Sequence, residues 1–269
     1  MSRALPRSLL LLLLVAVALR AAPARALDEV ESPRPWCAPE LEALSDTVCM
    51  YEPATEAAEG SERGPRTLVI FLHGLVKKGS DWAWGQQRLM ARMAKTHGLS
   101  ALMPRGRPAF GPGRDPEVLA WPTAQELQKD HEASVLQEWA AARAELERQS
   151  GPFQRVLVFG FSNGAYYATS LALRGKLTID GYGVFAGGSG GKYSRLLAGQ
   201  SAERVPIFVG YGTKDKARRD PRGLVTMLRS LGWPHRSKVD RIGHTVSDAQ
   251  IRAALAFLKA RADAGGAQR

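Results

Sequence analysis

The segment from Arg155 to Ala168 constrains the fold of this chain more than any other. It begins with an apolar, β-branched run at 155–161 of the kind that forms a buried strand, and continues in residues that can begin a helix. Ser162 lies at the junction, between Gly160 and Gly164. Glycines at those positions permit a tight, strained turn, which would hold the Ser162 hydroxyl clear of the sheet at the positive end of the helix. Ser162 is therefore a candidate nucleophile.

The same five residues also fit a strand–helix turn that carries an inert surface serine. A reactive serine needs a base and an acid nearby, so the rest of the chain has to decide between these interpretations. A second serine, Ser189, lies in a glycine run at 187–191. We expect this run to form a tight loop near the site, and Ser189 lacks the strand–turn–helix context of Ser162.

Strands and helices alternate through the chain from about residue 66 to 262. We expect buried strands at 67–75, 99–104, 155–161, 179–186, 205–212 and 236–242, and helices at 81–96, 123–149, 163–174, 216–232 and 247–262. This alternation predicts an α/β fold with a mostly parallel sheet and helices on both faces. No long insertion follows the later strands, so a large lid domain is not expected.

A base and an acid follow two of the later strands. His244 comes directly after the strand at 236–242, on a short loop where a general base for a serine would lie. Asp215 comes shortly after the strand at 205–212, where it could orient that histidine, although it could also pair with a neighbouring lysine. Asp220 and Asp240 are the alternative acids. His235 lies before the strand at 236–242 rather than after it, so it is not the expected base.

The order Ser162, Asp215, His244 resembles the order of the catalytic triad in the α/β-hydrolase superfamily of serine esterases. His73-Gly74 at the end of an early strand adds to this resemblance, which covers roughly residues 66–262. The motifs are similar to the phospholipase/carboxylesterase group, which includes acyl-protein thioesterases, and to secreted polyester-depolymerase and feruloyl-esterase relatives. The resemblance implies an acyl-enzyme mechanism without metal or organic cofactor.

The resemblance also assigns an oxyanion hole to two backbone N–H groups. They map to Leu75, after the first strand, and to Asn163, after the serine. Because both act through the main chain, their side chains matter little. His73 itself is expected to be structural.

Residues 105–122 form a long stretch rich in glycine, proline and arginine. In a fold of this kind the stretch would lie over the pocket, where Phe110 and Trp121 could line an acyl site. Three arginines could meet an anionic group of the substrate: Arg105, Arg107 and Arg114. A solvated connection without a role in binding is the alternative.

The first 26 residues have the form of a secretory signal peptide. Arg3 and Arg7 precede an apolar run at 9–19 that is short for a membrane span, and Ala24-Arg25-Ala26 is a small-x-small cleavage site. We expect the mature protein to begin near Leu27 and to be secreted or periplasmic. A retained N-terminal anchor is the alternative.

The two cysteines, Cys37 and Cys49, lie in an N-terminal segment at 27–65 that precedes the catalytic domain at 66–269. In an exported protein they can pair in a disulfide. Two cysteines alone do not supply the four ligands of a structural zinc site, so no metal is expected.

The formal net charge of +11 does not indicate nucleic-acid binding, because no basic stripe is interleaved with aromatic residues. It is compatible with an anionic polymer or lipid surface as a partner, or with a solvated surface. The sequence thus predicts a secreted serine hydrolase for small or polymeric esters. A serine peptidase and a non-catalytic binding protein remain open, as does the oligomeric state.

Overall fold

The computed structural model describes residues 35–53 and 65–266. The predicted signal peptide at 1–26 and the start of the mature chain lie outside these ranges. Residues Pro35–Arg269 form one compact unit. Among the described residues, no helix combines the length and the apolar character that crossing a membrane requires.

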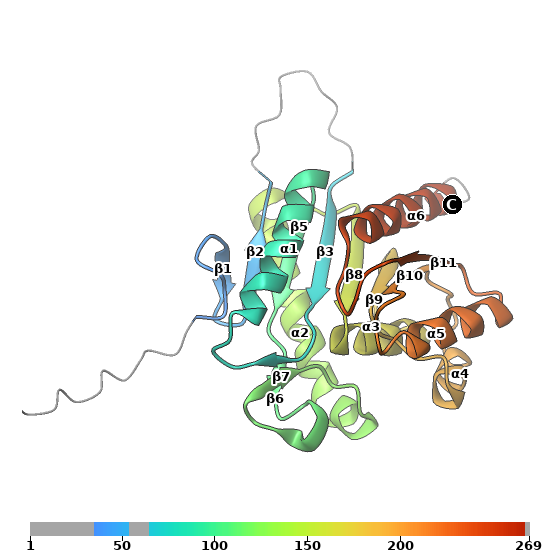
Figure 1. The fold of residues 1–269 in the computed structure, drawn as a ribbon. Coiled ribbons are helices and arrows are strands. Elements are labelled where there is room, and N and C mark those ends of the chain that lie inside the picture. Colours follow the sequence, from blue (N-terminus) through green and yellow to red (C-terminus); the bar gives the residue numbers. More distant parts are fainter. Residues whose placement is uncertain (1–34, 54–64, 267–269) are drawn as a thin grey trace, which may run out of the picture. The chain divides into compact units, whose positions relative to one another are not determined.

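An eight-stranded sheet runs through this unit in the order β1-β2-β5-β3-β8-β9-β10-β11 (Figure 1). Its strands are β1 Glu42–Ser45, β2 Val48–Tyr51, β5 Ser100–Pro104, β3 Thr67–Leu72, β8 Arg155–Phe161, β9 Gly181–Phe185, β10 Ile207–Gly212 and β11 His235–Asp240. The strands from β5 to β11 are parallel, and β1 and β2 add an antiparallel edge. The predicted α/β class with a mostly parallel sheet is confirmed.

Helices cover both faces of the sheet. They are α1 Trp82–His97, α2 Gln125–Ser150, α3 Asn163–Arg174, α4 Lys192–Ala198, α5 Arg219–Ser230 and α6 Asp248–Gly266. Helices α2, α3, α4 and α5 share one apolar core, to which the strands contribute residues such as Ile70 and Val158. Helices α1 and α6 share the other, with Phe71 and Leu157. Neighbouring strand residues thus face opposite layers, as pleated strands buried on both sides require.

Three short strands form a second, antiparallel sheet, and two of them come from the stretch that the sequence leaves as a loop. Strand β7 (Val118–Ala120) pairs with β6 (Arg107–Pro108) and with β4 (Val76–Lys77), and a short 3₁₀ turn, η1 (Pro112–Arg114), lies between β6 and β7. The segment is therefore ordered by hydrogen bonds to the residues that follow β3.

A disulfide joins Cys37 to Cys49 of β2, as the sequence predicts. The same segment is held by side-chain hydrogen bonds. Trp36 Nε1 donates to the Met103 carbonyl at 3.1 Å, and the Gln87 side chain bonds the backbone of Trp36 and of Ala38 at 2.9 Å each. Residues 36–49 are thereby fixed to β5 and α1.

Some predicted boundaries are wrong. The sequence suggests that Pro221 interrupts a helix at 216–232, but α5 begins at Arg219, so the proline lies in its first turn, where the missing N–H costs nothing. His235 is the first residue of β11 rather than a residue before it. Ser247 and Gln250 form a capping box at the start of α6, because each accepts a hydrogen bond from the other's backbone N–H.

Candidate active site

Ser162 lies in a strained turn between β8 and α3. Its backbone has φ 51° and ψ −114°, a region that residues with a side chain rarely adopt. A Cβ at residue 160 would lie 2.3 Å from the Gly164 carbonyl oxygen, and a Cβ at residue 164 would lie 2.2 Å from the Leu72 carbonyl oxygen. Both glycines are therefore required by close backbone approach, and the turn predicted from the sequence is present.

The three polar residues that follow β8, β10 and β11 meet in one chain of hydrogen bonds. The Ser162 hydroxyl lies 2.9 Å from Nε2 of His244, and Nδ1 of His244 lies 2.9 Å from Oδ2 of Asp215. A carboxylate only accepts, so Nδ1 carries the imidazole proton and Nε2 is free to accept the serine proton. This arrangement can activate a serine hydroxyl.

Local contacts hold Asp215 below the imidazole. The residue is 2% exposed, and its Oδ1 accepts a hydrogen bond from the Ala217 N–H at 2.8 Å. The backbone N–H of Lys214 donates to the Ile242 carbonyl at 2.9 Å, which ties the loop after β10 to the loop that carries His244. The geometry of the acid–base pair is thus set by main-chain contacts between neighbouring strand ends.

The alternative acids and the alternative histidine have other partners. The Tyr166 hydroxyl donates to Asp220, and the Ser247 hydroxyl donates to Asp240. Nδ1 of His235 lies 2.8 Å from the Trp233 carbonyl oxygen. The structure brings none of these three residues to Ser162.

Leu75 and Asn163, the residues expected to supply an oxyanion hole, border the same cleft as Ser162. Asn163 is the first residue of α3, so its N–H has no acceptor within the helix. A Cβ at residue 74 would lie 3.2 Å from the Cβ of Ser162, which brings the backbone before Leu75 directly against the serine. Two backbone donors can therefore face an oxygen bound beside Ser162.

His73 is buried beneath this loop, and its two ring nitrogens have defined roles. The Gly106 N–H donates to Nε2 at 2.8 Å, so the ring proton is on Nδ1, which donates to the Gly74 carbonyl. Burial lowers the pKa of His73 to about 4, against a smaller opposing effect of the Gly74 hydrogen bond. The Gly74 carbonyl belongs to the peptide whose N–H is that of Leu75. Neutral His73 thus fixes the orientation of a candidate oxyanion donor.

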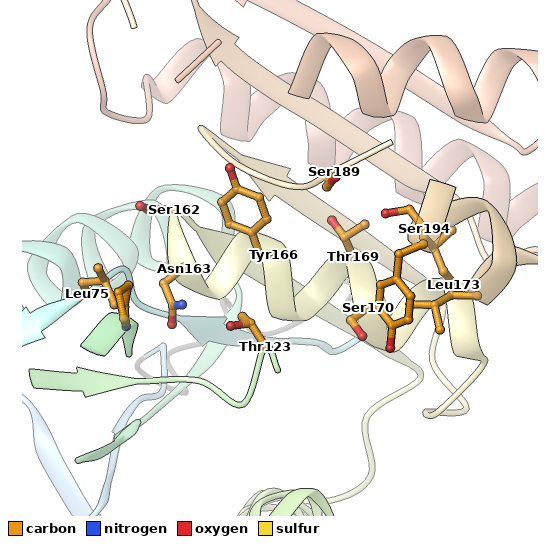
Figure 2. Close-up of a pocket in the computed structure, with 13 residues that line it drawn as sticks. Leu75, Thr123, Ser162, Asn163, Tyr166, Thr169, Ser170, Leu173, Ser189 and Ser194 are labelled. Carbon is orange, nitrogen blue, oxygen red and sulfur yellow. The ribbon is translucent and has the colours of Figure 1, made fainter. Parts of the chain in front are cut away.

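A cleft of about 350 Å³ opens beside Ser162 (Figure 2). The predicted substrate contacts at Phe110 and Trp121 are not among the residues that line it. Trp121 is 1% exposed, and its Nε1 donates to the His73 carbonyl at 2.8 Å, so it belongs to the core. The Phe110 ring packs on His131 instead. Both predictions are corrected, since these rings support the loops and do not face the cleft.

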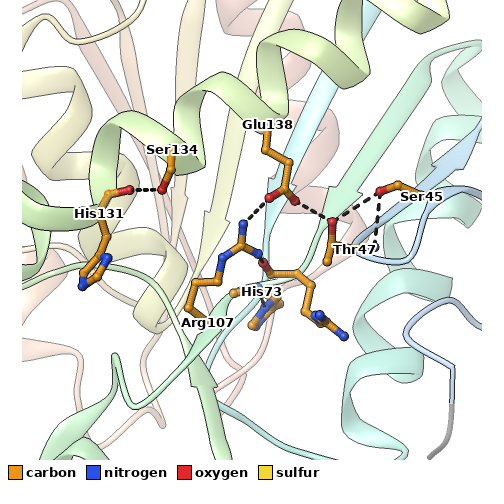
Figure 3. Close-up of polar contacts among 9 residues, drawn as sticks. Ser45, Thr47, His73, Arg107, His131, Ser134 and Glu138 are labelled. Atoms are coloured by element: carbon orange, nitrogen blue, oxygen red, sulfur yellow. Dashed lines mark hydrogen bonds and ion pairs between the residues drawn. The ribbon is translucent and has the colours of Figure 1, made fainter.

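The structure brings none of the three arginines considered for anion binding into the cleft, and two of them pair with glutamates. Arg107 pairs with Glu138, which in turn accepts a hydrogen bond from Thr47 at 2.8 Å (Figure 3). Arg114 pairs with Glu126 on the surface. The Arg105 backbone N–H donates to the Thr47 carbonyl, and none of the three arginines lines the cleft. These contacts fasten the 105–122 stretch to α2 and to the turn between β1 and β2.

Sequence reasoning misses the contribution of α3 to the site. Tyr166, one turn after Ser162, lines the cleft, and burial together with its hydrogen bond to Asp220 raises its pKa. Arg174 at the end of α3 forms a buried bidentate ion pair with Glu132 of α2. The spacing of Ser162, Tyr166 and Ser170 at one helical face is the signal that could have identified this wall.

The sheet order and the chain order of the three residues match the α/β-hydrolase fold. No protein-family model matches the chain. Acyl-protein thioesterase 1 from Eremothecium gossypii is 30% identical over 122 residues, which cover 43% of this chain and 52% of the thioesterase. The chain therefore spans about half the length of the curated relative that it matches.

Solved structures extend the similarity over most of the chain. Esterase PE8 has a TM-score of 0.54 and 22% identity, and covers 78% of this chain and 96% of its own. The Staphylococcus aureus serine hydrolase FphF has a TM-score of 0.52 at 13% identity, and the match covers 80% of this chain and 91% of FphF. Zea mays acyl-protein thioesterase 2 has a TM-score of 0.52 at 18% identity, and the match covers 80% of this chain and 98% of the thioesterase. The predicted α/β-hydrolase fold, and the resemblance to the acyl-protein thioesterase group, are confirmed.

Proposed function

We propose that this chain is a serine esterase that hydrolyses carboxylic esters or thioesters through an acyl-enzyme intermediate. The observation that carries the proposal is the continuous hydrogen-bond chain from Ser162 through His244 to Asp215, with 2.9 Å at each step. The names of the similar proteins, two acyl-protein thioesterases and an esterase, support the same class of reaction.

In the first half of the reaction, Ser162 Oγ attacks the carbonyl carbon of the ester while Nε2 of His244 takes the hydroxyl proton. Asp215 holds the Nδ1–H tautomer and stabilises the imidazolium that forms. The N–H groups of Leu75 and Asn163 receive the negative oxygen of the tetrahedral intermediate, and loss of one such donor typically raises the barrier by about 3–4 kcal/mol. His244 then passes the proton to the leaving oxygen or sulfur.

In the second half, water replaces the leaving group beside His244, which removes a proton from it as the water attacks the acyl carbon. Collapse of this second intermediate releases the acid and returns the proton to Ser162. The chain's own residues carry every proton transfer, and the proposed chemistry uses neither a metal nor an organic cofactor.

We also propose that the mature enzyme acts outside the cytoplasm. The predicted signal peptide at 1–26 motivates this location, and a Cys37–Cys49 disulfide is compatible with an oxidising compartment. The proposed organisation is a signal peptide, an N-terminal segment at 27–65 and a catalytic domain at 66–269. N-terminal sequencing of the exported protein tests it, and a mature chain that retains residues 1–26 would contradict it.

Hydrolysis of p-nitrophenyl acetate and butyrate by the protein and by Ser162→Ala tests the catalytic proposal. We expect Ser162→Ala to lose at least about 10³-fold in kcat, because the remaining donors cannot replace the nucleophile. Ser189→Ala is the matched control, since this second serine borders the same cleft but lies 27 positions later outside the turn. Activity that survives in Ser162→Ala and disappears in Ser189→Ala would contradict the assignment.

The same assay separates the two alternatives that the sequence leaves open. A serine peptidase would cleave p-nitroanilides as well as esters, although more slowly, and a binding protein would turn over neither. We expect turnover of esters with little or no turnover of the matched anilides.

A further inference from the structure

The cleft beside Ser162 continues as a groove along α3. Tyr166, Thr169, Ser170 and Leu173 recur at helical spacing and form its floor. Figure 2 shows Ser162 at one end of the groove and Leu173 at the other. The short helix α4 contributes Ser194 and Leu197 at the end near Leu173. Ser170 lies eight positions after Ser162, which corresponds to roughly 12 Å along a helix.

The groove lies on the acyl side of the site. Its lining includes Leu75 and Asn163, the candidate oxyanion donors, but not His244, which protonates the leaving group. A substrate whose carbonyl oxygen faces the two N–H groups would direct its leaving group toward His244 and its acyl chain along α3. The residues at the far end therefore contact the acyl chain.

The Ser170 hydroxyl can only donate to a molecule in this groove. Its oxygen lies 3.1 Å from Gln128 Nε2 and 3.1 Å from Arg174 Nε. Both groups are donors without acceptor capacity, so the hydroxyl oxygen accepts from both and its own hydrogen is used in neither bond. Ser170 is only 9% exposed, and it lines the groove. Its O–H is therefore a fixed donor whose remaining direction is toward the groove.

Ser194 supplies a second hydroxyl at the same end. The residue is 7% exposed, lines the groove from α4, and its side chain has no hydrogen-bond partner within residues 35–53 and 65–266. The hydroxyl lines an open cleft, so water can bond it while the groove is empty, and a bound molecule that displaces this water has to supply a partner in its place. Two hydroxyls with unused hydrogen-bonding capacity thus line the same groove, one from α3 and one from α4.

We propose that the acyl chain of the substrate carries oxygen atoms along its length, as in an alkoxy-, hydroxy- or oligoester acyl group, and that Ser170 and Ser194 bind an acceptor oxygen remote from the scissile carbonyl. This inference rests on the proposed esterase function. A plain hydrocarbon chain would cover both hydroxyls without offering them a partner. Leu173 and Leu197 contact the intervening methylene groups.

The test compares p-nitrophenyl esters of acyl chains with equal length, 3,6,9-trioxadecanoate and decanoate. The short pair methoxyacetate and butyrate corrects for the activation that an ether oxygen on the α carbon causes. We expect the long-pair ratio of kcat/KM, oxygen chain over hydrocarbon, to exceed the short-pair ratio by about tenfold or more. In Ser170→Ala and in Ser194→Ala this excess should fall to about a third or less.

Ser134→Ala on α2 is the matched control, because Ser134 is an exposed serine whose hydroxyl donates to the His131 carbonyl, away from the groove. The Ser134→Ala variant should keep the wild-type excess of the long-pair kcat/KM ratio over the short-pair ratio. If Ser170→Ala fails to fold, Ser194→Ala carries the comparison alone. Equal long-pair and short-pair ratios, or an excess that neither serine variant reduces, would overturn the inference while butyrate turnover sustains the proposed function. Absence of turnover with all four esters would overturn the proposed function itself.

Discussion

The carboxylate of Asp215 accepts a hydrogen bond from Nδ1 of His244 at 2.9 Å, although 29 positions separate the two residues in the sequence. Asp215 is 2% exposed, whereas the His244 side chain is 43% exposed. The acid is thus fixed inside the protein, and the imidazole extends from it to Ser162 and to solvent. This asymmetry suits a base that has to reach both a nucleophile and a leaving group.

Replacing the acid should abolish most activity without unfolding the protein. We expect Asp215→Asn to lower kcat about 10³–10⁴-fold, because an amide favours the wrong histidine tautomer. Asparagine retains an oxygen for the Ala217 N–H, so the loop should persist. Steady-state kinetics with p-nitrophenyl acetate measure the effect. Asp240→Asn is the control, and a larger loss there than in Asp215→Asn would refute the assignment of the acid.

Buried His73 should make the protein less stable in mild acid. Its pKa is about 4 in the folded protein and 6.5 ordinarily, so the unfolded chain binds the proton more readily. The contribution of neutral His73 is full above about pH 6.5 and is lost as the pH falls toward 4. The loss between pH 7 and pH 4.5 should be about 2 kcal/mol.

Urea unfolding of the protein and of His73→Asn at both pH values measures this contribution. Asparagine removes the titrating ring, so the variant should lose about 2 kcal/mol less between the two pH values than the parent does. Equal losses in both proteins would show that His73 is not held neutral. Ester turnover of the variant should also decrease, because His73 fixes the peptide that carries the Leu75 N–H.

Removing one partner of the ion pair between Glu132 and Arg174 should cost far more stability than removing one partner of a surface pair. The side chains of Glu132 and Arg174 are 8% and 9% exposed, so Glu132→Ala leaves a buried guanidinium without its carboxylate. We expect a loss of about 3–5 kcal/mol in the free energy of unfolding. Glu145→Ala removes the partner of exposed Arg148 on the same helix and should cost much less, because water screens that pair. Similar losses in both variants would contradict the distinction.

Much of the fold follows from the sequence because the strands of a parallel sheet are continuous apolar runs. The positions of Ser162, Asp215 and His244 follow for the same reason, since the carboxyl ends of parallel strands meet at one edge. Each of these residues is recognisable from local context alone: a tight glycine turn, or a polar residue just after a buried strand.

Other features depend on contacts between distant segments and could not be predicted. Trp121 stands in a stretch rich in proline and glycine, and only its packing on Trp139 and Tyr167 makes it a core residue. Glu132 lies among charged residues on a long helix, and it is buried because Arg174 reaches it from α3. The groove wall at Ser170 arises from the same packing of helices against one another.

Reaction with a fluorophosphonate probe tests the central claim most directly, because the probe forms a covalent bond only with an activated hydroxyl. We predict one probe molecule per chain, located by peptide mass spectrometry on Ser162, and no labelling of Ser162→Ala or of heat-unfolded protein. Labelling at another residue, or no labelling of folded protein with an intact Ser162, would contradict the account.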